Sequence, residues 1–124
     1  MPQQFEVRLS ESKSVDELRS LRDALNNENE LRGHARLEQS TPHEGALGGT
    51  LEVVAVALGP GGAAAIVSHV LITWIKQRRS QVSLRIRRED GTEIELEADR
   101  VRAADPQQLR QLITDTAEAL ENDR

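Results

Sequence analysis

The sequence predicts a single α+β domain over residues 1–124, with a small mixed four-stranded sheet and helices mainly on one face. Short segments in which apolar and polar residues alternate are typical of half-buried strands. Longer segments with apolar residues three and four positions apart are typical of amphipathic helices. A chain of 124 residues is long enough for one modest core. The predicted order of elements is β-α-β-α-α-β-β-α, which is typical of α+β domains.

The first predicted elements lie in the N-terminal third of the chain. Residues 5–9 alternate between apolar and charged side chains, which predicts a strand. Ser14 and Glu17 have the spacing of a capping box, so a helix is expected to begin there. That helix carries a leucine face and should end at Asn26-Asn27. A second, short strand is expected over residues 35–39.

The most apolar part of the chain runs from residue 51 to residue 75 and is broken by glycines and a proline. We expect a glycine-hinged apolar helical hairpin over residues 50–79, with one helix over 50–58 and another over 63–79. A membrane span needs about 20 uninterrupted apolar residues, so the second helix has the length of a core helix. The expected hinge consists of Gly59, Pro60, Gly61 and Gly62.

The second helix of this hairpin supplies the candidate interaction surface. Its apolar face is wide, and its C-terminal end is basic, which suits the negative end of the helix dipole. The candidate contact residues are Ile66, Val70, Trp74, Lys76, Arg78 and Arg79.

Two alternating runs, at residues 82–86 and 94–98, predict a β-hairpin. Pairing Ile86 with Ile94 leaves a three-residue loop whose last residue, Gly91, suits a left-handed conformation. The same register sets opposite charges across from each other on the outer face, Arg87 with Glu93 and Arg85 with Glu95.

The last predicted helix begins after Asp105, a capping residue, with Pro106 at its first position. Its apolar residues recur at helical spacing and are expected to be buried. The helix is expected to bury Leu109, Leu112, Ile113, Thr116 and Leu120.

The composition and the motifs indicate that the protein is not an enzyme and holds no metal or cofactor. The chain has no cysteine, which excludes thiol nucleophiles and cysteine-ligated zinc. His34, His43 and His69 lack metal-ligand spacing. The N-terminus lacks the basic and apolar regions of a secretion signal, so a cytoplasmic location is expected.

The glycine-broken segment and the residues after it resemble a known bacterial family. Val56-Ala-Leu-Gly-Pro-Gly-Gly-Ala63, then Trp74-Ile-Lys-Gln-Arg-Arg-Ser80, then the hairpin and Arg100-Val101, resemble the effector-associated constant component family, first type. Members are encoded beside variable effectors in predicted conflict (immunity) systems. The resemblance implies an adaptor that couples an effector, such as a peptidase, or a regulatory ATPase encoded nearby, to its trigger. It implies no catalytic residues, and it leaves homo-oligomerisation open.

Two alternative functions stay open at the level of sequence. The apolar hairpin is also compatible with a latent membrane-active effector that a partner releases, which would associate with membranes on activation. From Ala35 onward the predicted order is similar to a K-homology domain of the first type, in which a Gly-x-x-Gly loop between two helices clamps nucleic acid. Pro60 and Gly61 in the loop, and the absence of basic residues in the next helical turn, disfavour nucleic acid.

Overall fold

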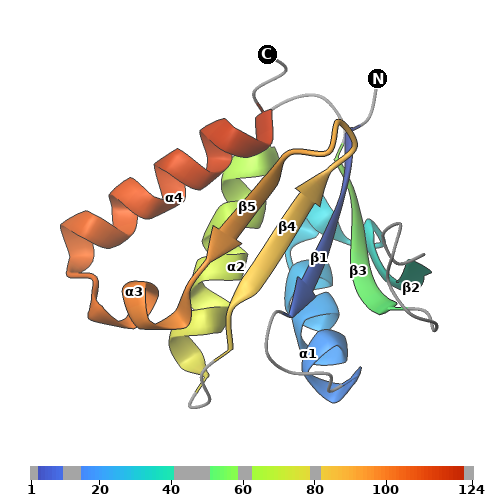
Figure 1. Cartoon of the computed structure of the whole chain (residues 1–124), viewed down its shortest axis with the longest axis horizontal. Coiled ribbons are helices and arrows are strands. Elements are labelled where there is room, and N and C mark those ends of the chain that lie inside the picture. Colours follow the sequence, from blue (N-terminus) through green and yellow to red (C-terminus); the bar gives the residue numbers. More distant parts are fainter. Residues whose placement is uncertain (1–2, 10–14, 41–50, 59–62, 79–81, 122–124) are drawn as a thin grey trace.

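One antiparallel sheet forms the first layer of the molecule and helices form the second (Figure 1). This computed structural model describes residues 3–9, 15–40, 51–58, 63–78 and 82–121. The elements in chain order are β1 (Gln3–Leu9), α1 (Val15–Asn26), the short 3-10 helix η1 (Asn29–Leu31), β2 (Ala35–Ser40), β3 (Leu51–Leu58), α2 (Ala63–Gln77), β4 (Leu84–Arg88), β5 (Glu93–Leu96), α3 (Ala98–Ala103) and α4 (Pro106–Glu121).

The sheet has five strands in the order β2-β3-β1-β4-β5. All neighbouring strands are antiparallel, so the predicted α+β class is confirmed while the mixed four-stranded sheet is wrong. The N-terminal strand β1 is central, with β3 on one side and β4 on the other. The strands β2 and β5 form the two edges.

The additional strand is β3, in the segment for which we expected a helix. Its central residues Val53, Val54, Ala55 and Val56 are all buried, although only Val54 and Val56 belong to the core cluster beneath the helices. A continuous apolar run of this length suits a central strand as well as a helix, and its β-branched valines favour a strand. The predicted helical hairpin over residues 50–79 is therefore wrong in its first half. The predicted hinge, residues 59–62, lies outside the described residues.

The helices α1, α2 and α4 lie on the same face of the sheet, as predicted (Figure 1). The helix α2 lies at the centre of this layer and buries Val67, Leu71 and Ile75 completely. The buried residues of β1, β4 and α1 belong to the same hydrophobic cluster. From α4, Thr116 and Leu120 are buried, while Leu109, Leu112 and Ile113 are half-buried against the core.

The β4–β5 hairpin has the predicted register. Ile86 pairs with Ile94, and Gly91 has a φ of 93°, in the left-handed region where glycine is favoured. The start of α4 is also as predicted, because Asp105 Oδ1 accepts a hydrogen bond of 2.7 Å from the backbone N–H of Gln108. The helix α3 was not expected, since Ala98 was assigned to the preceding strand.

Candidate interaction surface

The face of the sheet turned away from the helices is predominantly charged. Phe5 and Val7 face the core, so the intervening residues of β1 point to the opposite face. The strand registers place the neighbouring side chains of this face. Its charged residues are Glu6, Arg8, Arg36, Glu38, Arg85, Arg87, Glu93 and Glu95. In Figure 1, α1 and α2 lie behind this face, and α3 and α4 lie beside β5.

Ion pairs cross the uncovered face between strands. Arg85 lies 3.4 Å from the Glu95 carboxylate, as the register predicts. Glu93, however, does not pair with Arg87, its direct neighbour on β4, but with Arg8 of β1 at 3.3 Å. A long arginine side chain reaches such diagonal positions readily.

The displaced pairing leaves Arg87 without a hydrogen bond or ion pair to any described residue. Its side chain lines a hollow of about 430 Å³ on the uncovered face. The hollow also contains carboxylates and side-chain amides, so it presents both signs of charge and several hydrogen-bonding groups. Its other lining residues are Gln4, Phe5, Glu6, Glu38, Gln39, Ala55, Arg88 and Glu89.

The residues predicted from α2 as a contact surface are mostly turned inward. Val70 and Trp74 belong to the core, with exposed fractions of 8% and 4%. Ile66 is half-buried, and Lys76 is exposed. Arg79 lies outside the described residues. Whether any of these residues contacts a partner stays a prediction.

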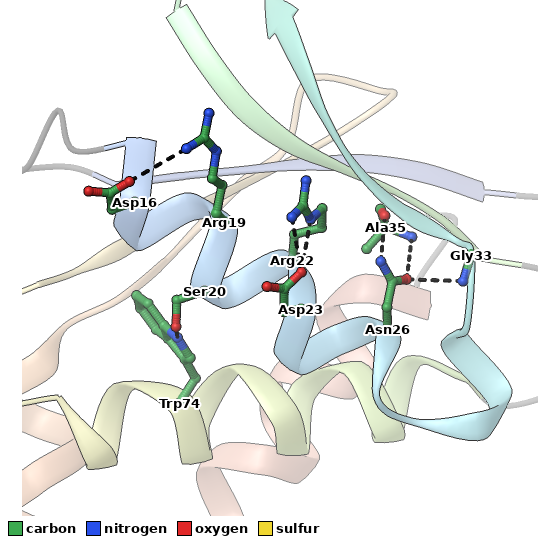
Figure 2. Close-up of polar contacts among 9 residues, drawn as sticks. All are labelled: Asp16, Arg19, Ser20, Arg22, Asp23, Asn26, Gly33, Ala35 and Trp74. Atoms are coloured by element: carbon green, nitrogen blue, oxygen red, sulfur yellow. Dashed lines mark hydrogen bonds and ion pairs between the residues drawn. The ribbon is translucent and has the colours of Figure 1, made fainter.

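Trp74 takes part in a polar cluster that joins α1 to α2. Its indole Nε1 donates a hydrogen bond of 3.1 Å to Ser20 Oγ (Figure 2). The guanidinium of Arg78 lies 4.4 Å from the centre of the Trp74 ring, and it donates to the same hydroxyl. Arg78 also forms an ion pair of 3.7 Å with Glu17. Arg78 is thus held against α1 rather than projected into solvent.

The edge strand β2 is partly closed by the side chain of Asn26. Its Oδ1 accepts hydrogen bonds from the backbone N–H groups of Gly33, at 3.1 Å, and Ala35, at 3.2 Å. Its Nδ2 donates to the carbonyl oxygen of Ala35 at 2.9 Å (Figure 2). The amide thereby replaces a neighbouring strand at Ala35. The sequence pattern predicts a helix end at Asn26 but not this contact with the edge strand.

The described residues contain no group of three or more histidines, cysteines, aspartates or glutamates that is placed to hold a metal ion. His34 Nδ1 lies 3.0 Å from the carbonyl oxygen of Ala57, which ties β2 to β3. His69 is exposed on α2, and His43 lies outside the described residues. Within the described part of the chain, no helix is both long enough and apolar enough to cross a membrane.

The carboxyl group of Asp90 in the β4–β5 loop has a shifted pKa. The backbone N–H of Thr92 donates to Asp90 Oδ1 at 2.9 Å, and this bond holds the pKa of Asp90 below its ordinary value. A side-chain hydrogen bond from Thr92 and the positive charge of Arg88 act in the same direction. The hydrogen bonds that lower this pKa lie within the β4–β5 loop.

The fold and the surface define an α+β domain whose antiparallel sheet is covered by helices on one face and carries paired charges on the other. The chain matches the family described as Effector Associated Constant Component 1 over residues 10–117, and it belongs to that family. The resemblance drawn from the glycine-broken segment is thereby confirmed. The family description indicates a component that is associated with an effector. No curated protein and no solved structure matches the chain.

The two alternative functions lose their structural basis in the segment before the glycines. A K-homology domain of the first type places a helix on each side of its Gly-x-x-Gly loop. Here the preceding element is the strand β3, so the predicted similarity to the element order of that fold is wrong. The membrane interpretation depended on an apolar helical hairpin, and the strand removes one of its two helices.

Proposed function

We propose that this domain is a non-enzymatic interaction component of a bacterial conflict system, in which it couples an effector to its trigger. Family membership supports the association with an effector. The observation that carries the proposal is the uncovered sheet face, where Arg87 lines a hollow without a bonded partner among the described residues. We propose an effector such as a peptidase, or a regulatory ATPase encoded nearby, as the partner.

The charge pattern of the uncovered face favours reversible association over permanent assembly. Permanent interfaces are strongly apolar, whereas this face carries charges of both signs. Complementary charges accelerate encounter and exclude wrong partners more than they add affinity. An adaptor that engages an effector only after a trigger needs this combination of selectivity and release.

The proposal is tested by binding the purified chain to the purified product of the neighbouring effector gene. We expect saturable binding in isothermal titration calorimetry, with an affinity that falls as salt is raised. Replacing Arg87 with glutamine should weaken binding about tenfold, because the partner's acidic group loses the guanidinium that pairs with it. Arg110→Gln is the matched control, since Arg110 is an exposed arginine of α4.

Both variants should unfold at the same temperature as the unchanged chain, so that a loss of binding reports the surface and not the fold. Failure of the unchanged chain to bind either the neighbouring effector or the neighbouring ATPase would refute the proposed function. Equal weakening by both variants would show that the contact lies elsewhere than on the uncovered face.

A further inference from the structure

Two residues of the edge strand β5 direct their backbone groups away from β4, and no strand among the described residues pairs with them. Arg88 N donates to the carbonyl oxygen of Thr92 at 2.9 Å, which fixes which residues of β5 bond to β4. Hydrogen-bonded pairs alternate along an antiparallel ladder, so Ile94 and Leu96 direct their backbone groups to β4. Glu93 and Glu95 therefore direct their N–H and C=O groups outward. Beyond β5 the described sheet has no further strand.

The opposite edge is less accessible to a partner strand. By the same alternation, Ala35, Leu37 and Gln39 direct their backbone groups away from β3. The side chain of Asn26 already occupies both groups of Ala35. A strand added at β2 would have to displace this amide or stop short of it. The two edges thus differ, and β5 is the one without a side-chain cap among the described residues.

The side chains of β5 specify what kind of strand fits beside it. Glu93 and Glu95 lie on the uncovered face, with side chains 37% and 44% exposed. Their existing ion pairs, at 3.3 and 3.4 Å, are of the exposed kind that contributes little, so both carboxylates can accept further donors. Ile94, between them, is half-buried on the opposite face against the core.

The helices α3 and α4 flank the outer side of β5 (Figure 1). Between them is a hollow of about 360 Å³ lined by Ala103, Ala104 and Leu112 together with the polar residues Arg100, Gln108, Gln111 and Asp115. One face of a strand added beside β5 would lie toward this hollow between α3 and α4. Apolar side chains on that face would extend the contact that Ile94 makes with the core.

We propose that β5 is a docking edge that receives an extended segment of the partner as a further strand of the sheet. Directly opposed residues of neighbouring strands project to the same face. The segment therefore carries basic residues opposite Glu93 and Glu95 and an apolar residue opposite Ile94. This inference rests on the proposed function, because it assigns the partner's point of attachment, and it commits the partner to a basic, alternating segment.

The test uses a defined probe, the acetylated hexapeptide Lys-Val-Arg-Val-Lys-Val, and its acidic counterpart Glu-Val-Glu-Val-Glu-Val. Both are titrated into the isotope-labelled full chain and followed by NMR. The basic peptide should shift the amide signals of Glu93 and Glu95 and slow the exchange of their protons with solvent. Its affinity should fall with salt. Equal binding of the acidic peptide, or protection of Leu37 and Gln39 instead, would overturn the proposal.

Substitution by proline tests the backbone contact. Glu95→Pro removes an outward N–H and leaves the ladder to β4 intact, which edge strands tolerate. It should weaken peptide binding about tenfold, the effect of losing one well-placed hydrogen bond. Glu95→Gln measures the loss of charge alone. Gln39→Pro is the matched control, because it removes an outward N–H at the other edge and should leave binding unchanged.

A second measurement does not depend on the folding of any variant. A basic peptide methylated on alternate backbone nitrogens loses the donors that would pair with β5, and it should no longer bind the unchanged chain. Unimpaired binding of the methylated peptide would overturn the proposal.

The purified effector separates this inference from the proposed function. If it binds the unchanged chain and the Glu95→Pro variant equally, the docking edge is refuted while the adaptor function stands. If it does not bind the unchanged chain, the adaptor function is refuted, and the peptide titration alone decides whether β5 accepts a strand.

Discussion

The Arg8 guanidinium lies 3.3 Å from the Glu93 carboxylate, which joins the central strand β1 to the edge strand β5 across β4. We predict that Arg8→Ala lowers the free energy of unfolding by less than about 1 kcal/mol, because the pair is partly exposed. Urea unfolding of Arg8→Ala, Glu93→Gln and the double variant gives the coupling energy. The coupling should shrink as salt is added. A coupling that salt leaves unchanged would contradict this description of the pair.

Asn26 caps the edge of β2, so its removal should destabilise the fold. We predict that Asn26→Ala lowers the free energy of unfolding by about 1–3 kcal/mol, because it leaves the backbone groups of Ala35 without a partner. Asn27→Ala changes the exposed neighbouring asparagine and serves as the control, with an expected change within about 0.5 kcal/mol. Chemical denaturation measures both. Equal effects at the two positions would show that the cap does not stabilise the strand.

The hydroxyl of Ser20 accepts from both Trp74 and Arg78. We predict that Ser20→Ala lowers the free energy of unfolding by about 1–2 kcal/mol, since it leaves the indole N–H of the buried Trp74 without its acceptor. Trp74 is the only tryptophan, so its fluorescence follows the unfolding directly. Arg19→Ala, at an exposed position of the same helix, should have little effect. Native fluorescence should change in Ser20→Ala and not in the control.

Asp105 and Gln108 form a reciprocal cap at the start of α4, with bonds of 2.7 and 2.9 Å. We predict that Asp105→Ala lowers the free energy of unfolding by about 1 kcal/mol. Gln107→Ala, an exposed residue in the same turn, is the control. Thermal unfolding followed by circular dichroism distinguishes the two. An unchanged midpoint in Asp105→Ala would show that the cap contributes nothing measurable.

The lowered pKa of Asp90 predicts a pH dependence of stability. A carboxyl group with a lower pKa in the folded state stabilises that state when it is ionised. Its contribution is fully present above the unfolded-state pKa of about 4 and is lost as the pH falls through the lower folded-state value. The stability difference between the unchanged chain and Asp90→Asn should therefore vanish in strong acid. NMR titration of the Asp90 carboxyl carbon would contradict this prediction if its midpoint lay at or above the ordinary aspartate value.

The sequence predicted elements well wherever two independent signals agreed. In the β4–β5 hairpin, apolar alternation and opposed charges specified one register, and Gly91 specified the loop. At α4 a capping residue and a proline coincided with the start of the apolar periodicity. Periodicity alone does not distinguish strand from helix in a short, continuously apolar run, so it predicts a helix over residues 50–58 where the structure has the strand β3. Its strand conformation depends on β1 and β2, which pair with it from distant parts of the sequence.

The candidate surface was harder to predict than the fold. A cross-strand register identifies neighbours but not the rotamer that an arginine adopts, so Arg87 was assigned to a carboxylate that belongs to Arg8. The apolar face of α2 and its basic end were both visible in the sequence. Only the packing of α1 against α2 shows that Trp74 and Arg78 face Ser20 rather than solvent. The one available signal for Asn26 was its position at the helix end, directly before a turn.

Because β1 is central in the sheet, its two neighbours reach it at very different times during synthesis. The strand β1 leaves the ribosome before either of its neighbours. Its neighbour β3 is complete at Leu58, whereas its other neighbour β4 begins only at Leu84. Until β4 has been translated, β1 has an open side and the buried face of α2 lacks part of its cover. Such long-range pairing slows folding and exposes apolar surface to other chains. Nascent forms of this protein are therefore expected to rely on chaperones until the second half of the sheet is made.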